Sequence, residues 1–211
     1  MPSSQFPRLR PLAAVAAAAL FVAGNVQAEY LWLQRDGSAA TTGRFGEVGK
    51  AAQPVASLAA VRASGASGKE LPLTVETDRI VFSSGHDGDL RLTASLSKAA
   101  GVLHYYQAKS GRSETRAVND LELVPTEANG NSFKLMWKGK QVAASQVNVD
   151  TSDGWQRVLK PAADGTVTLA TPFPGLYVLE VTARVDGAAT IEGKKYEDVR
   201  HTATLSFEVP R

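Results

Sequence analysis

The most informative feature of this chain is what it lacks, beginning with cysteine. None of its 211 residues is Cys, which excludes disulfide bridges, thiolate metal sites and cysteine nucleophiles. There are only three His, and the 23 basic residues nearly balance the 21 acidic ones, so the charge does not indicate binding to nucleic acid or to an anionic membrane. The G-x-S-x-G, H-E-x-x-H and P-loop motifs are missing, and we therefore expect no enzyme activity.

Long apolar runs are also missing, apart from one near the N-terminus. It covers residues 12–23, follows two arginines and precedes small residues at the positions that signal peptidase reads, ending at Ala28. This is the pattern of a cleaved secretory signal, and the run is short for a membrane-spanning helix of about 20 residues. We predict a signal peptide at residues 1–28, a mature N-terminus at Glu29 without a transmembrane segment, and a periplasmic or secreted location.

The mature chain does contain short runs of alternating apolar and polar residues, separated by Gly, Pro and Asp turns. Such runs predict β-strands with one apolar and one polar face. In the second half they fall at residues 132–137, 146–150, 155–159, 166–170, 176–185 and 202–209. Asp164-Gly165, between two of these runs, predicts a hairpin. So many short strands in about 90 residues indicate two stacked sheets, a β-sandwich.

The first half is less regular but also rich in strand patterns. Strands are expected at residues 30–33, 71–75, 79–83, 89–95 and 101–106. The Ala/Leu-rich segment 55–62 predicts a short helix, and the glycine-flanked segment 43–47 predicts a loop. We place a boundary in the polar stretch 111–119. The prediction is an all-β protein with two β-rich modules, at residues 29–118 and 119–211.

Several short motifs are spread along the mature chain. They are YLWL (residues 30–33), FGE (45–47), LELVP (121–125), FKL (133–135), GK (139–140), GW (154–155), DG (164–165), PGLYVLE (174–180) and RHTATL (200–205). In this combination, nearly all of the mature chain resembles the DUF4198 family, which is described as a periplasmic component of nickel or cobalt uptake. The resemblance implies a divalent transition metal as the ligand and envelope metal-uptake components as partners.

The second half carries a further resemblance. Its Asp-Gly turns, alternating strands and Pro-Gly-x-Tyr sequence are similar to those of transthyretin-like and carboxypeptidase-regulatory modules. This implies an Ig-like or transthyretin-like β-sandwich for residues 119–211. Many DUF4198 members begin after cleavage with a His just before Trp-Leu, whereas this chain has Glu29 there, which offers its amine and carboxylate instead.

Candidate metal ligands occur in three places. His86-Asp87-Gly88-Asp89 joins an imidazole to two carboxylates, a nitrogen and oxygen donor set that suits nickel, cobalt, zinc or copper, although Asp87-Gly88 alone also predicts a hairpin turn. His201 closely follows Glu197, and His104 shares a predicted strand face with Tyr106. The predicted ligand set is His86, Asp87, Asp89, His104, Glu197 and His201. Each histidine also fits a structural role in a sheet, and Glu47 fits either an ion ligand or a turn cap.

These observations favour a periplasmic, non-enzymatic binding protein that is an accessory to transition-metal uptake. The alternative is an envelope β-sandwich module that binds another protein without a metal ligand. A glycosidase would need two carboxylates that converge across a cleft, which a sequence does not reveal.

Overall fold

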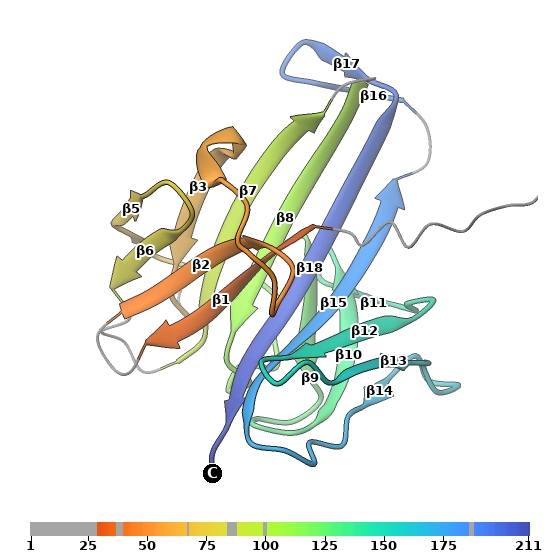
Figure 1. The fold of residues 1–211 in the computed structure, drawn as a ribbon. Helices are drawn as coiled ribbons and strands as arrows, with labels where there is room; N and C mark the ends of the chain where they lie inside the picture. The colour runs from red at the N-terminus through yellow and green to blue at the C-terminus, as the bar shows by residue number, and fades with distance from the viewer. Residues whose placement is uncertain (1–28, 37–39, 67, 84–87, 99–100, 186–187) are drawn as a thin grey trace, which may run out of the picture.

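The structure is a computed structural model that describes residues 29–36, 40–66, 68–83, 88–98, 101–185 and 188–211 (Figure 1). These residues form β-strands, and their one helical turn is the three-residue 3-10 helix η1 (Val55–Ser57). The prediction of an all-β protein is therefore confirmed. Within these ranges no helix has the length and apolarity needed to span a bilayer.

A central sheet of eight strands draws on both halves of the chain. Neighbouring strands are antiparallel except for β8 and β18, which pair in parallel and join the two halves. Strands from both sides of the predicted boundary at residues 118 and 119 therefore lie in one sheet. In spatial order the strands are β13 (Gln156–Leu159), β12 (Val147–Thr151), β15 (Gly175–Val185), β18 (Asp198–Val209), β8 (Val102–Ser110), β7 (Leu90–Lys98), β3 (Ala59–Ser64) and β4 (Glu70–Leu71).

Two smaller sheets flank the central one. The N-terminal sheet has the order β1 (Tyr30–Asp36), β2 (Ala40–Gly46), β6 (Ile80–Ser83) and β5 (Leu73–Val75). In the C-terminal sheet, β10 (Ser132–Trp137) pairs with β9 (Leu121–Pro125), β11 (Lys140–Val142) and β14 (Val167–Thr168). The strands β16 (Ala189–Ile191) and β17 (Lys194–Tyr196) form a separate hairpin beyond the end of the central sheet.

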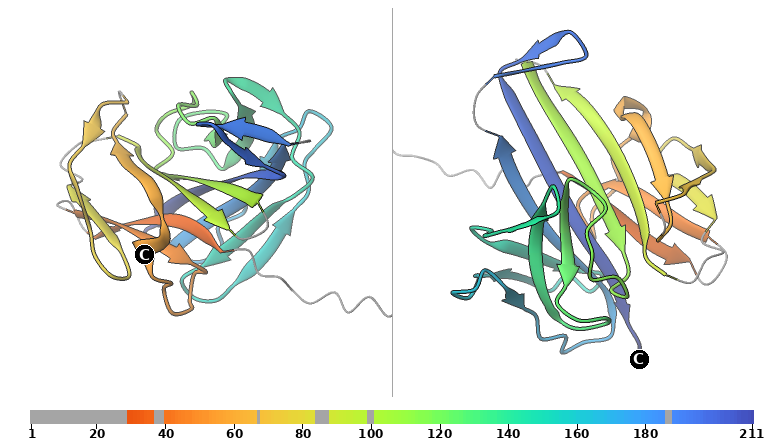
Figure 2. Two further views of the ribbon diagram at one scale, coloured as in Figure 1. Left: turned by 90° about the horizontal axis from the view of Figure 1, so that it is seen from above. Right: turned by 180° about the vertical axis from the view of Figure 1, so that it is seen from behind.

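The two smaller sheets cover opposite faces of the central sheet (Figures 1 and 2). Along β15, Tyr177 and Leu179 face the C-terminal sheet, while Leu176 and Val178 pack with aromatic residues of β1. Because successive side chains of a strand point to opposite faces, both faces of β15 are buried. The predicted stacking of sheets is thus present, with a shared layer in the middle.

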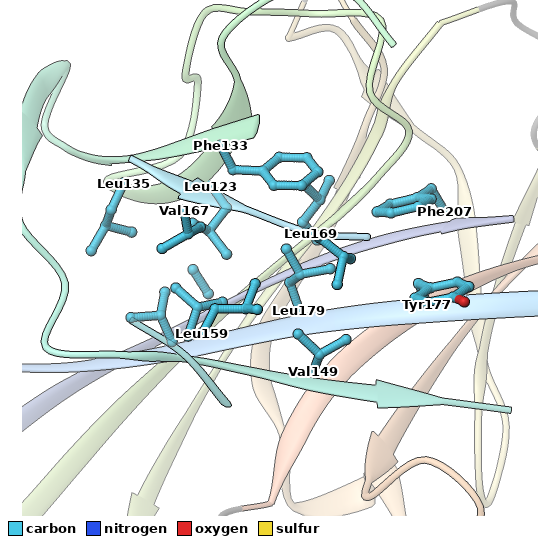
Figure 3. Packing of buried hydrophobic residues seen from close by; sticks show 14 of the residues in the cluster. Leu123, Phe133, Leu135, Val149, Leu159, Val167, Leu169, Tyr177, Leu179 and Phe207 are labelled. Carbon is cyan, nitrogen blue, oxygen red and sulfur yellow. The ribbon is translucent and has the colours of Figure 1, made fainter. Parts of the chain in front are cut away.

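The largest core lies between the central and C-terminal sheets (Figure 3). Phe133 of β10 is fully buried and lies 6.1 Å, between ring centroids, from Phe207 of β18, which in turn stacks on Tyr177. Burying each such side chain contributes about 1.5–3 kcal/mol. On each of these strands, the alternation of side chains places the buried residues on the face that points into this core.

Three local predictions are wrong. No helix covers residues 55–62: after η1 the chain becomes β3, which pairs with β7 and buries Ala63 in the core. This pairing outweighs the helical preference of Ala and Leu. The segment 43–47 is mostly strand rather than loop, since β2 continues to Gly46.

The predicted hairpin around Asp164-Gly165 is also wrong, although the turn itself exists. The amide of Gly165 donates to the carbonyl of Ala162 at 2.9 Å, and Gly165 has φ +79°. The strands on either side separate, because β13 pairs with β12 in the central sheet and β14 pairs with β10 in the C-terminal sheet. The turn therefore connects the central sheet to the C-terminal sheet.

Candidate functional site

A pocket of about 420 Å³ opens beside Glu29, the residue that precedes β1. We call it the N-terminal pocket. Its titratable lining residues are Glu29, Glu47, Lys50, Lys98, His104 and Arg200. They come from the start of the chain described by the structure, the segment after β2, and the strands β7, β8 and β18, so the pocket forms only when distant segments meet.

The strand registers place these side chains together. The β7–β8 pairing sets Lys98 opposite Val102, two residues before His104 on the same face. The parallel β8–β18 pairing sets Arg200 opposite His104. Glu47 follows Gly46, whose φ of +126° suits glycine. One pairing between consecutive strands, one long-range parallel pairing and one turn therefore define the site.

Oppositely charged side chains pair across the pocket. Lys98 Nζ lies 3.1 Å from a carboxylate oxygen of Glu29, and Lys50 Nζ lies 2.7 Å from one of Glu47. All four side chains are partly exposed, and such surface pairs typically contribute about 0–1 kcal/mol to stability. A charged ligand can therefore replace either partner at little energetic cost.

The third cation of the pocket, Arg200, shares a carboxylate with Arg184. Both guanidinium groups donate to Asp198, at 2.7 Å from Arg200 Nη2 and 2.9 Å from Arg184 Nε. The hydrogen bonds from Arg200, with the charges of both arginines, lower the pKa of Asp198. Asp198 therefore holds Arg200 at the pocket as a carboxylate.

His104 forms the buried wall of the pocket and is held on both ring nitrogens. Nε2 lies 2.7 Å from Oγ1 of Thr202, Nδ1 lies 3.2 Å from the hydroxyl of Tyr106, and the two rings stack. Burial, followed by the charges of Lys98 and Arg200, lowers the pKa of His104 to about 4. His104 is therefore neutral near pH 7.

The hydrogen bonds of His104 continue across the central sheet. Thr202 Oγ1 lies 2.6 Å from Thr182 Oγ1, and Thr182 donates to Glu180 at 2.6 Å. Since each hydroxyl has a single proton, these hydrogen bonds have one consistent direction. Tyr106 donates to Nδ1 of His104, and the Nε2–H of His104 donates to Thr202. Thr202 then donates to Thr182, which donates to Glu180. This order fixes the Nε2–H tautomer of His104.

His201 lies on the opposite face of the sheet. It stacks on Tyr105, with ring centroids 4.8 Å apart, and meets Trp137 edge-on at 4.7 Å. Burial lowers its pKa to about 4, and its Nδ1 has no hydrogen-bond partner among the described residues. Because His104 and His201 occupy adjacent strands but opposite faces, they cannot share a ligand.

Replacing His201 by Phe is expected to reduce the acid sensitivity of the fold. The unfolded state of the wild type binds a proton at His201 near pH 6.5, whereas the folded state does so only near pH 4, so stability falls as the pH drops through this interval. Between about pH 7 and about pH 5 the wild type should lose about 2 kcal/mol more than the variant. Urea unfolding at both pH values measures this, and an identical loss in both proteins would contradict it.

The other predicted ligands have different surroundings. Asp89 is buried, lies 2.9 Å from Lys109 Nζ, and accepts hydrogen bonds from Ser113 and Glu114. Burial alone would raise the pKa of Asp89, but Lys109 and these hydrogen bonds outweigh it and lower the pKa. Its carboxylate is thus fully engaged inside the protein.

Glu197 is exposed and pairs with Lys195 at 3.1 Å, near the β16–β17 hairpin. His86 and Asp87 lie outside the described residues. Across the part of the chain that the structure describes, no group of three or more His, Asp or Glu side chains could hold a metal ion. The described members of the predicted ligand set are therefore not brought together.

Sequence reasoning identified Glu29, Glu47 and His104 separately but missed Lys50, Lys98 and Arg200. No local pattern singles out these three cations, because Lys98 and Arg200 meet through the β7–β8 and β8–β18 pairings and Lys50 lies in the segment after β2. The sequence shows Arg200 in the motif RHTATL, but it does not predict that Arg200 lines a pocket.

In comparison with known proteins, no family model and no curated protein matches the chain.

Proposed function

We propose that the protein is an exported, non-enzymatic binding protein, an accessory to nickel or cobalt uptake, and that it binds the metal as a complex with a small organic chelator. The N-terminal pocket is the single observation that carries this proposal. The signal-peptide pattern of residues 1–28 and the resemblance to DUF4198 add the location and the metal.

The form of the ligand follows from the geometry of the pocket. A bare transition-metal ion needs several donor atoms at about 2.0–2.2 Å from one point, and such a group is lacking among the described residues. A pocket of about 420 Å³ instead has room for a ligand of molecular size.

The charges of the pocket suit a chelate. The carboxylates of an organic chelator would bind Lys50, Lys98 and Arg200, as cations bind carboxylates elsewhere in proteins. Glu29 and Glu47 would accept hydrogen bonds from amines or waters that the metal coordinates. Neutral His104 offers a polar wall without adding charge.

Titration calorimetry tests the proposal, using nickel and cobalt both as free ions and as citrate complexes, with citrate alone as a reference. The complexes are expected to bind with Kd below about 100 μM and more tightly than either component. Lys98→Gln should weaken this binding about tenfold.

The matched control is Lys195→Gln, which also removes an exposed, ion-paired lysine but lies outside the pocket. It should bind like the wild type. The absence of binding by every form of both metals, or an equal loss in the two variants, would reject the proposal.

Protein binding is the second candidate, and the edge of the central sheet favours it. Among the described strands, β13 pairs only with β12, and Val158 on it is 51% exposed. An open strand edge is a template on which a partner can add a strand. Capture of an envelope partner that Val158→Lys abolishes, without any binding of a metal complex, would favour this function.

A further inference from the structure

A second pocket, of about 210 Å³, is lined by residues at the ends of β8 and β18. Figure 1 shows these two strand ends near the C-terminus. Two arginines line the pocket: Arg35 of β1 and Arg112, which follows β8. His104 of the N-terminal pocket and Ser110 of this one are six residues apart on β8, which corresponds to about 20 Å of strand. The two pockets are therefore separate sites.

Neither arginine has a carboxylate partner among the described residues. Arg35 donates Nε to the hydroxyl of Ser110 at 3.3 Å and Nη2 to the carbonyl of Gly88. Arg112 donates Nη1 to the side chain of Asn131 and lies 3.9 Å above the ring of Phe207. All of these partners are neutral.

This differs from Arg91, which is fully buried, and from the exposed Arg184 and Arg200. Arg91 is paired with Glu114 and Glu122, and Arg184 and Arg200 share Asp198. Only in this pocket do two partly buried guanidinium groups meet without an ion pair, as far as the described residues show.

Both guanidinium groups keep donors available. Nη1 of Arg35 makes no hydrogen bond to the described residues, and neither do Nε and Nη2 of Arg112. Burial without a compensating acid lowers the pKa of Arg112, which still leaves it charged near pH 7. A guanidinium with free donors is suited to two-point recognition of an oxyanion.

The acid on the rim sets the net charge of the pocket. Glu208 lines it but forms no ion pair with either arginine, and burial raises its pKa. Among the lining residues that the structure describes, two arginines face one acid, so a positive charge is left uncompensated. Its volume corresponds to about seven water molecules, enough for a small anion.

We propose that this pocket binds a small oxyanion, the carboxylate or phosphate group of a small molecule, between Arg35 and Arg112. Phe207 and Leu176 also line the pocket, but Arg112 covers the ring of Phe207 and both residues are 5% exposed, so the apolar part of the lining is small. This site is independent of the N-terminal pocket and of its proposed metal complex.

Calorimetry at low ionic strength tests this proposal with three probes: inorganic phosphate, succinate and benzoate. At least one should bind the full-length mature protein with Kd below about 1 mM. Tighter binding of phosphate would identify a phosphate-bearing ligand, and tighter binding of benzoate would identify an organic acid with an apolar body. No binding of any probe below about 1 mM would overturn the proposal.

Variants connect the binding to the pocket. Arg112→Gln should weaken it about tenfold or more, through loss of a charge-assisted hydrogen bond. Glu208→Gln removes a negative charge that repels the anion, and it should strengthen binding about threefold. The exposed Arg157→Gln on β13 and the Lys98→Gln variant of the other pocket should not alter it.

These variants also separate the two proposals. If Arg112→Gln unfolds, Glu208→Gln still decides, because an unchanged or weaker affinity in that variant contradicts the assignment. Loss of metal-complex binding in Lys98→Gln leaves the oxyanion site untouched, so either proposal can fail alone.

Discussion

Replacing Glu122 by Gln is expected to lower the free energy of unfolding by about 3–5 kcal/mol. The side chain of Glu122 is 1% exposed and accepts hydrogen bonds from Nε and Nη2 of Arg91, at 3.0 and 2.8 Å. It also lies 3.7 Å from Lys109 and accepts from the amides of Val118 and Asn119. Since Arg91 and Lys109 are both fully buried, loss of this charge leaves them poorly compensated.

The network around Glu122 explains why the effect should be large. Lys109 also pairs with Asp89, and Arg91 also pairs with Glu114. These groups tie β7, β8 and β9 to the segment between β8 and β9, so the network fixes the passage from one half of the chain to the other. Breaking one member of a buried set costs much more than breaking an exposed pair.

Urea unfolding followed by Trp fluorescence measures the change. The matched control is Glu70→Gln, which removes the partner of Arg62 from a pair in which both side chains are 72% exposed. That variant should lose at most about 1 kcal/mol. A loss below about 1 kcal/mol for Glu122→Gln as well would show that the buried network contributes little.

Replacing Phe133 by Ala is expected to cost about 3–5 kcal/mol. Its ring is fully buried between the central and C-terminal sheets, where it contacts the cluster that includes Phe207 and Leu169 (Figure 3). Removing it forfeits the burial of the ring and leaves a cavity between two sheets that cannot close freely, since strand pairing holds their backbones.

The matched control is Phe173→Ala, because this ring is 46% exposed and packs on the edge of Trp155. Thermal and urea unfolding should show a loss of about 1 kcal/mol or less for it. If both variants lost similar amounts, the shared core would not be the main source of stability. Comparable losses would also argue against the stacking of the C-terminal sheet on the central sheet.

Local patterns predicted the strands well where one face is buried and the other is polar. The alternation of residues 133–137 and 203–209 gave the correct inward faces, and His104 and Tyr106 share a face as expected. The pattern failed at residues 55–62, where pairing with β7 rather than propensity decides the structure. The periodicity therefore predicted which face of a strand is buried, but not which strands pair with each other.

The sequence did not predict which distant strands pair with each other. Nothing in residues 102–110 or 198–209 indicates that these strands run side by side in parallel, yet this pairing brings Arg200 to His104. Asp89 illustrates the same limit: beside Gly88 it resembles a turn or ligand residue, whereas its partners, Lys109 and Ser113, lie 20 or more residues further on. A candidate site built from sequence neighbours misses such contacts.

The position of β18 has a consequence for how the protein matures. Among the described strands it comes last in sequence, yet it lies between β15 and β8 in the middle of the central sheet. During synthesis from the N-terminus, both of its neighbours exist before the strand that joins them. Until the 12 residues of β18 are made, the facing edges of β15 and β8 are unpaired, and each can pair with a strand of another molecule. Protection from association thus depends on a strand that is made after both of its neighbours.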